Sequence, residues 1–132
     1  MPLAVDEPTS PALVEVLTHD PEVTVWWTAR VECASAVGRR ERSGEMTTEQ
    51  ASYALRQVDE LIDGWVEVPP GERLRDLASR LVRVHDLRAA DALQLAAATV
   101  ASESRPESLE IVTLDDRLAL AASREGFRVL PI

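Results

Sequence analysis

The chain has 132 residues, the size of a single domain, and its hydrophobic fraction of 45% is typical of a globular protein rather than a disordered one. Its formal net charge of -9 disfavours nucleic acid and anionic membranes as partners on average, although a local basic patch can act against that mean. The single cysteine, Cys33, excludes an internal disulfide and multi-cysteine zinc sites, and no apolar run is long enough for a membrane span, so we expect a cytoplasmic protein.

The N-terminal third of the chain predicts a helix, a strand and a second helix. Thr9-Ser10-Pro11 is a typical helix start, with a capping hydroxyl followed by proline. The β-branched and aromatic run Val23–Trp27 predicts a strand that is buried on both faces. A helical pattern follows from Ala29 to Arg42 and stops at Ser43-Gly44.

The middle of the chain predicts a helix and a second strand. Thr47 and Gln50 form a capping-box pattern that opens a helix reaching about Asp63. Trp65–Val68 predicts the strand, which ends at Pro69-Pro70. The helix is expected to present one apolar face, made of Ala51, Ala54, Leu55, Val58, Leu61 and Ile62.

The C-terminal half alternates in the same way. An apolar stripe predicts one helix, and an alanine-rich helix, Ala89–Ala101, comes next. Strand Ile111–Leu114, a helix capped by Asp115-Asp116 and ended by Gly126, and strand Phe127–Leu130 complete the chain. Strands separated by helices favour parallel pairing and an α/β sandwich. The stripe consists of Leu74, Leu77, Leu81 and Val84.

Three acidic residues fall where ligands gather in such folds, beyond the carboxyl ends of strands. Glu32 and Asp115 each follow a predicted strand, and Asp91 opens the alanine-rich helix among small, apolar neighbours. Converging carboxylates repel one another unless a cation neutralises them, and Mg²⁺ and Mn²⁺ prefer oxygen ligands. A cation held in this way can activate water and stabilise the charge on a phosphodiester.

Each acid also has a structural interpretation. Asp115 is a candidate helix N-cap, a role that Asp116 shares. Glu32 and Asp91 lie near predicted helix N-termini, where the helix dipole favours acids in any protein. From spacing alone, the metal site and the structural roles both stay open.

Four segments resemble the PIN-domain ribonucleases in order and in spacing, over nearly the whole chain. Thr28–Ala36 (TARVECASA) is similar to the R-x-E-x-x-S/A helix start of that family, and Leu87–Ala98 (LRAADALQLAAA) to its L-R-x-x-D-A-L-x-L-A-x-A helix. Val112–Ala119 (VTLDDRLA) resembles V-T-x-D-x-x-L-A, and Gly126–Val129 fits the family's ending. Among these ribonucleases, the chain most resembles the VapC-like toxins of toxin–antitoxin pairs.

The resemblance implies a three-layer α/β sandwich with a short, mostly parallel sheet, forming a single PIN-like domain over residues 1–132. It implies that Glu32, Asp91 and Asp115 are the catalytic acids of a Mg²⁺ or Mn²⁺ site that cleaves RNA. Thr113 would be a supporting hydroxyl, and Asp116, at a variable family position, a possible auxiliary. The implied partners are the RNA substrate, a cognate antitoxin and a second copy in a homodimer, with no membrane.

The chain departs from the family at its N-terminus. PIN domains usually open with a short hydrophobic strand ending in a metal-binding Asp, whereas Met1–Pro8 matches the segment that normally comes after that strand. Asp6 aligns with the acidic turn before Ser10-Pro11, so we expect the missing ligand to belong before Met1. Either the start is placed too late or the first strand is lost, in which case another chain could fill the gap in the sheet.

The other conspicuous residues have structural interpretations. We expect Trp26 and Trp27 to be core and interface residues, Cys33 a small buried hydrophobe, and His85 a capping or packing residue. Arg39–Arg42 favours a solvated helix end, with phosphate contact as the alternative. A salt-bridged surface is the expected role of a further arginine set, although one of them could enter the site from its rim. This set comprises Arg73, Arg75, Arg80, Arg83 and Arg88.

The resemblance therefore implies a metal-dependent endoribonuclease, the toxin of a toxin–antitoxin pair. A catalytically silent PIN-like module that acts in dimerisation or antitoxin binding is the main rival, and the absent first Asp supports it. A phospho-acceptor α/β domain that uses Asp115 is a third interpretation. It is disfavoured because that fold needs an acid pair after its first strand and a lysine after its last, and this chain has no lysine.

Overall fold

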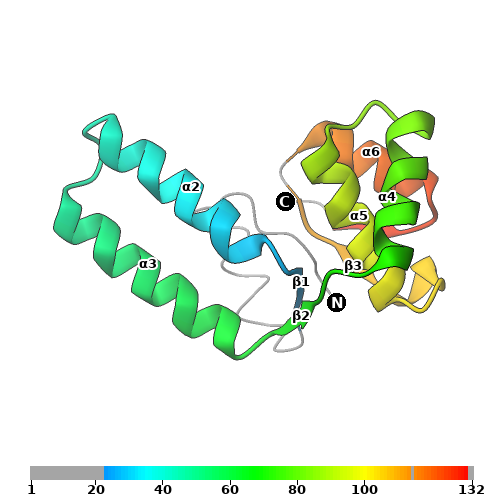
Figure 1. Ribbon diagram of the computed structural model, residues 1–132, viewed down its shortest axis with the longest axis horizontal. Helices are drawn as coiled ribbons and strands as arrows, with labels where there is room; N and C mark the ends of the chain where they lie inside the picture. The colour runs from blue at the N-terminus through cyan, green and yellow to red at the C-terminus, as the bar shows by residue number, and fades with distance from the viewer. Residues whose placement is uncertain (1–22, 114, 131–132) are drawn as a thin grey trace.

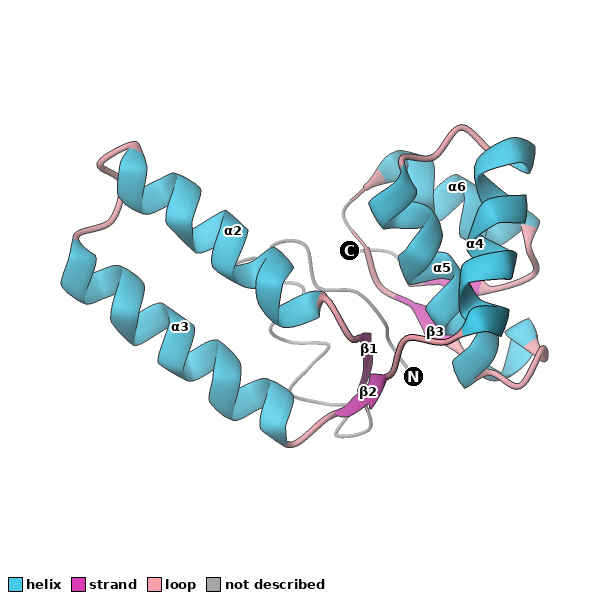
Figure 2. Cartoon of the chain, in the orientation of Figure 1, coloured by secondary structure: helices cyan, strands magenta, loops and turns pink. Residues whose placement is uncertain are grey.

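The computed structural model describes residues 23–113 and 115–130, and within them the chain is an α/β protein (Figures 1 and 2). The expected helix start at Thr9 lies outside the described residues. The elements follow the predicted order: β1 (Thr24–Trp26), α2 (Ala29–Arg42), α3 (Thr48–Asp63), β2 (Val66–Val68), α4 (Glu72–Val84), α5 (Ala89–Ala101), the 3-10 turn η1 (Pro106–Ser108), β3 (Glu110–Ile111), α6 (Asp116–Arg124) and β4 (Arg128–Val129).

The strands form two parallel pairs. β1 pairs with β2, with Thr24 opposite Val66, and β3 pairs with β4, with Ile111 opposite Val129. Each pair is connected through helices, as parallel strands require. Every residue of β1 is at most 5% exposed, which confirms the prediction of a strand buried on both faces.

The alanine-rich helix α5 is the centre of the core. It contacts β1 and β2 as well as α4 and α6. Ala92, Ala96, Ala97 and Ala98 are fully buried, and Leu95 is 1% exposed. Small side chains let neighbouring backbones approach closely, so one helix can pack against several elements at once. The first turn of this helix also carries Asp91, whose position is therefore fixed by the core.

Helices α2 and α3 form a hairpin that projects from the rest of the molecule (Figure 1). The predicted capping box is confirmed, since the Thr47 hydroxyl accepts from Gln50 N–H and the Gln50 side chain accepts from Thr47 N–H. At the base of the hairpin, Arg30 of α2 donates to acids of α3 and β2. Its three partners are Asp59 at 3.1 Å, Asp63 at 2.7 Å and Glu67 at 3.3 Å.

All four predicted strands are shorter than expected. Val23–Trp27 is observed as Thr24–Trp26, and Trp65–Val68 is observed as Val66–Val68. The expected strand Ile111–Leu114 is observed as Glu110–Ile111, and Leu114 lies outside the described residues. The expected strand Phe127–Leu130 is observed as Arg128–Val129, although the Leu130 N–H still donates to the Ile111 carbonyl. The pairing stops early because the chain after Ile111 turns into the cap of α6.

Three expectations about burial are wrong. Leu61, expected on the apolar face of its helix, is 51% exposed, because α3 packs on α2 along a narrow seam in the projecting hairpin. Val84 is 57% exposed because it is the last residue of α4. Trp27 is 56% exposed because β1 ends at Trp26 and the chain then turns into α2, whereas Trp26 is buried as expected.

The C-terminal ends of α4 and α6 are joined by a polar cluster. His85 caps α4, and its Nε2 lies 2.8 Å from one Glu125 oxygen, while Arg80 donates to the other oxygen at 2.6 Å. His85 is almost fully buried, so the expected capping or packing role is confirmed. Gly126 follows with a φ of +96°, the left-handed conformation that ends a helix most easily at glycine.

The helices of the described ranges include none that is both long and apolar enough to cross a membrane.

We predict that the contacts of Glu125 with His85 and Arg80 make the protein less stable in acid. Burial raises the pKa of Glu125, but the hydrogen bonds from His85 and Arg80 outweigh it and hold that pKa below the ordinary value. A carboxyl whose pKa is lowered by folding stabilises the protein above its unfolded pKa, and that contribution is lost as pH falls through the folded pKa. We expect Glu125→Gln to cost about 1–2 kcal/mol of unfolding free energy above about pH 5, and progressively less as the pH falls through the folded pKa of Glu125.

Urea denaturation of both proteins across this pH range measures the difference. A gap between wild type and variant that stays constant from about pH 7 to pH 3 would show that the ionised carboxylate contributes nothing.

Candidate functional site

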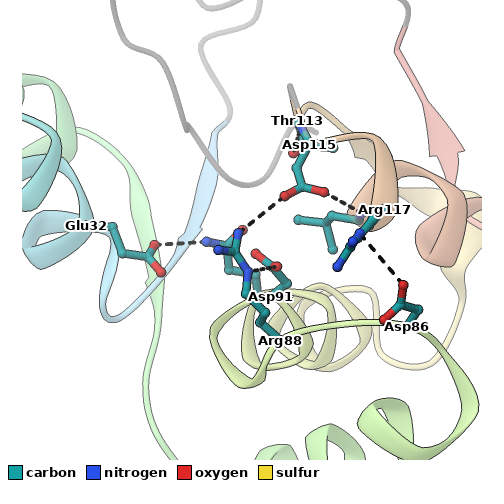
Figure 3. Close-up of polar contacts among 9 residues, drawn as sticks. Glu32, Asp86, Arg88, Asp91, Thr113, Asp115 and Arg117 are labelled. Carbon is teal, nitrogen blue, oxygen red and sulfur yellow. Dashed lines mark hydrogen bonds and ion pairs between the residues drawn. The ribbon is translucent and has the colours of Figure 1, made fainter.

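Asp91 and Asp115 come from different elements and are joined by one arginine (Figure 3). Arg88 Nε lies 3.4 Å from Asp91 Oδ2, and Arg88 Nη2 lies 3.6 Å from Asp115 Oδ2. The Asp91 side chain is only 12% exposed and the Asp115 side chain 26%, whereas the Arg88 side chain is 77% exposed. Two carboxylates thus share one guanidinium, which reaches them from the solvent side and offsets one of their two negative charges.

Glu32 is connected to the same helix through an amide. Gln94 lies one turn after Asp91 on α5, and its Nε2 donates to Glu32 Oε2 at 2.9 Å. The Gln94 residue is 5% exposed, and its Oε1 has no hydrogen-bond partner among the described residues. A buried acceptor that lacks a donor is costly, so this oxygen is a candidate for a further polar partner.

Asp115 is held by its own turn. Its backbone N–H donates to Thr113 Oγ1 at 3.1 Å, and its Oδ1 accepts from the Leu118 N–H at 3.0 Å. The N-cap interpretation of Asp115 is therefore confirmed. The second oxygen, Oδ2, faces Arg88, so the cap leaves one carboxylate oxygen for another partner. Thr113 is buried, and its hydroxyl helps to fix the backbone of Asp115.

An open pocket lies over these residues. It has a volume of about 420 Å³ and is lined by Arg88, Asp115, Asp116 and Arg117. Asp116 is exposed in the first turn of α6. Arg117 is paired with Asp86 at 3.7 Å, a loose ion pair between two exposed side chains. The pocket therefore combines carboxylates with guanidinium groups that are weakly held.

The donor chemistry suits a hard divalent cation, but the three acids are not gathered as a ready cluster. Within residues 23–113 and 115–130, no three side chains of the His, Cys, Asp and Glu types come close enough together to hold a metal ion. Arg88 joins Asp91 to Asp115, and Gln94 joins Glu32 to the same helix. Carboxylate oxygens and the unpaired Gln94 Oε1 are nevertheless the ligand types that Mg²⁺ and Mn²⁺ prefer.

Sequence reasoning did not assign a role to Gln94, and it grouped Arg88 with the surface arginines. The sequence could have indicated both residues, because Arg88 lies three positions before Asp91 and Gln94 lies three positions after it. Residues three apart on a helix share a face. Arg88 also directly precedes α5, so an extended backbone places it at the N-terminus beside Asp91.

The cap and the ion pair of Asp115 can be separated by substitution. Asp115→Ala removes the cap oxygen of α6 and should lower the free energy of unfolding by about 1 kcal/mol. Asp115→Asn should stay within about 0.5 kcal/mol of wild type, because asparagine caps helices as well as aspartate and the lost pairing with exposed Arg88 is weak. Urea denaturation measures both, and an Asn variant as unstable as the Ala variant would contradict the capping role.

Comparison with models of protein families finds no match to this chain, and comparison with curated proteins finds none either. The function must therefore be inferred from the residues of the site and their geometry.

Proposed function

We propose that this chain is a PIN-like endoribonuclease that uses Mg²⁺ or Mn²⁺, the toxin of a VapC-like toxin–antitoxin pair. One observation carries the proposal: Arg88 connects Asp91 to Asp115, while Gln94 of the same helix holds Glu32. Three acids that are far apart in the sequence are thereby linked to the first two turns of α5. They are also the three acids that match the family's motifs.

The finer architecture belongs to the same proposal. We interpret the two parallel pairs, β1–β2 and β3–β4, as halves of one sheet in a three-layer sandwich that forms a single domain. The contacts of α5 with β1, β2 and α6 support this interpretation, because one helix then covers parts of both halves. Joining the halves requires an extended segment between them, supplied by this chain or by a partner's strand.

In this proposal the three acids bind the cation, and neighbouring residues keep the acids in position. Asp91 and Oδ2 of Asp115 would be ligands, together with Glu32. Thr113 keeps the backbone of Asp115 in place, and Asp116 lies at the pocket as an auxiliary carboxylate. When bound, a divalent cation supplies an activated water and stabilises the charge that develops on the phosphodiester.

Three further parts of the chain have roles in this proposal. Gln94 orients Glu32 through its amide N–H. The burial of Asp91 keeps bulk water away from one side of the acids. The open pocket beside Arg88 and Arg117 gives an RNA phosphate access to the acids. These residues would bind and position the substrate, and the chemistry would depend on the acids.

The proposed partners are an antitoxin and a second copy of the chain, in the cytoplasm. Two exposed apolar side chains next to Glu32 support a partner surface there. Trp27 lies just before α2 and is 56% exposed, and Val31 lies in the first turn of α2 and is 70% exposed. A partner that covers these two side chains would lie beside Glu32.

A catalytically silent PIN-like module remains a second candidate, and one observation favours it. The guanidinium of Arg88 already offsets one of the two negative charges of Asp91 and Asp115, so the acid pair is partly stabilised without any cation. Such a chain would act through dimerisation or antitoxin binding alone.

Cleavage of a mixed RNA pool in Mn²⁺ or Mg²⁺ tests the proposal. Wild type should cleave, EDTA should stop the reaction, and Asp91→Asn should reduce the rate by more than about 100-fold, because even outer-shell partners of metal ligands are worth about 10- to 100-fold. Asp86→Asn is the matched control, since it makes the same change at a carboxylate that pairs with Arg117 outside the three acids.

The outcomes separate the two candidates. Cleavage that resists EDTA, or that survives in Asp91→Asn, would exclude the proposed site. A folded wild type that binds Mn²⁺ or antitoxin without cleaving RNA would favour the silent module.

A further inference from the structure

The space between Asp91 and Asp115 is occupied by a cationic group of the chain itself. Arg88 Nε lies 3.4 Å from Asp91 Oδ2, and Arg88 Nη2 lies 3.6 Å from Asp115 Oδ2 (Figure 3). Both distances are long for charge-assisted hydrogen bonds, which usually lie near 2.7–2.9 Å. The guanidinium therefore acts on the two carboxylates mainly through its charge, which offsets one of their two negative charges.

Arg88 is held loosely compared with the acids that it joins. Its side chain is 77% exposed, whereas those of Asp91 and Asp115 are 12% and 26% exposed. Asp91 belongs to the buried start of α5, and Asp115 is fixed by its cap to Leu118 N–H. If one member of this trio leaves, it is the arginine, because moving it into solvent disturbs neither helix.

A second, independent observation comes from the next turn of α5. Gln94 Oε1 is buried one turn along α5 from Asp91 and, in the part of the chain that is described, accepts no hydrogen bond. Its amide cannot simply turn over, because Nε2 is already used to hold Glu32. A hard cation or one of its bound waters would satisfy this oxygen as well as the carboxylates.

We propose that Arg88 is a built-in counter-ion that competes with a divalent cation for Asp91 and Asp115. In the cation-free protein the guanidinium suppresses the repulsion between the two carboxylates. When Asp91 and Asp115 take a cation, Arg88 withdraws toward the pocket, because a second positive charge between the same two oxygens is repelled. This inference rests on the proposed metal site, but it does not depend on RNA being the substrate.

The competition predicts that removing the guanidinium tightens cation binding. Arg88→Gln should bind Mn²⁺ about tenfold more tightly than wild type at low ionic strength, since one competing charge is removed at close range. Lysine carries a single point charge that cannot span both carboxylates. The Mn²⁺ affinity of Arg88→Lys should therefore lie between those of wild type and Arg88→Gln. Isothermal titration with Mn²⁺ alone measures the three affinities, and the rise in melting temperature with Mn²⁺ gives a second readout.

Arg117→Gln is the matched control. Arg117 lines the same pocket and carries the same charge, but it pairs with Asp86. Its loss should change the Mn²⁺ affinity by less than about threefold, because its charge lies outside the acid pair. Adding Asp91→Asn to Arg88→Gln should abolish the tight binding, which locates the cation.

Each result supports the competition or overturns it. Equal Mn²⁺ affinity of wild type and Arg88→Gln, equal tightening by Arg117→Gln, or no Mn²⁺ binding by any folded variant would overturn it. If Arg88→Gln fails to fold, the Arg88→Lys affinity decides, and an affinity equal to or weaker than that of wild type would overturn the proposal. Tighter Mn²⁺ binding without RNA cleavage would leave the competition standing and refute the ribonuclease proposal instead.

Discussion

Close packing of small side chains on α5 is the constraint on which the rest of the structure depends. The buried alanines at positions 92 and 96–98 allow β1, β2, α4 and α6 to contact one helix. A larger residue at any of these positions would separate the backbones and open gaps in the core. The same packing fixes the orientation of α5 and therefore the directions in which Asp91 and Gln94 point.

The polar contacts at the N-terminal end of α5 follow from that packing. A carboxylate and an amide that the core holds in buried positions need partners, and two neighbouring elements supply them. Glu32 of α2 accepts from Gln94, and Asp115 at the start of α6 shares Arg88 with Asp91. The candidate site is thus a set of polar contacts between the central helix and its neighbours, with one acceptor oxygen of Gln94 still unpaired among the described residues.

Much of the fold was predictable because its signals are local. The capping box at Thr47 and Gln50, the N-cap at Asp115 and the helix end at Gly126 all depend on residues a few positions apart. The exposure of Trp27 and Leu61 was not predictable, since it depends on where β1 ends and on the projection of the α2–α3 hairpin. The three acids were identified from their positions after strands and at a helix start, but their connection through Arg88 and Gln94 required distances between side chains.

The most direct test of the site is diffraction from crystals soaked in Mn²⁺, with data collected at the manganese absorption edge. We expect one anomalous peak beside the carboxylates of Asp91 and Asp115, with the Arg88 guanidinium displaced from the position that it occupies here. An Arg88 that remains between the two carboxylates, with no peak beside them, would contradict the assignment. A peak only at Asp59 and Asp63, the acids that Arg30 joins, would contradict it equally.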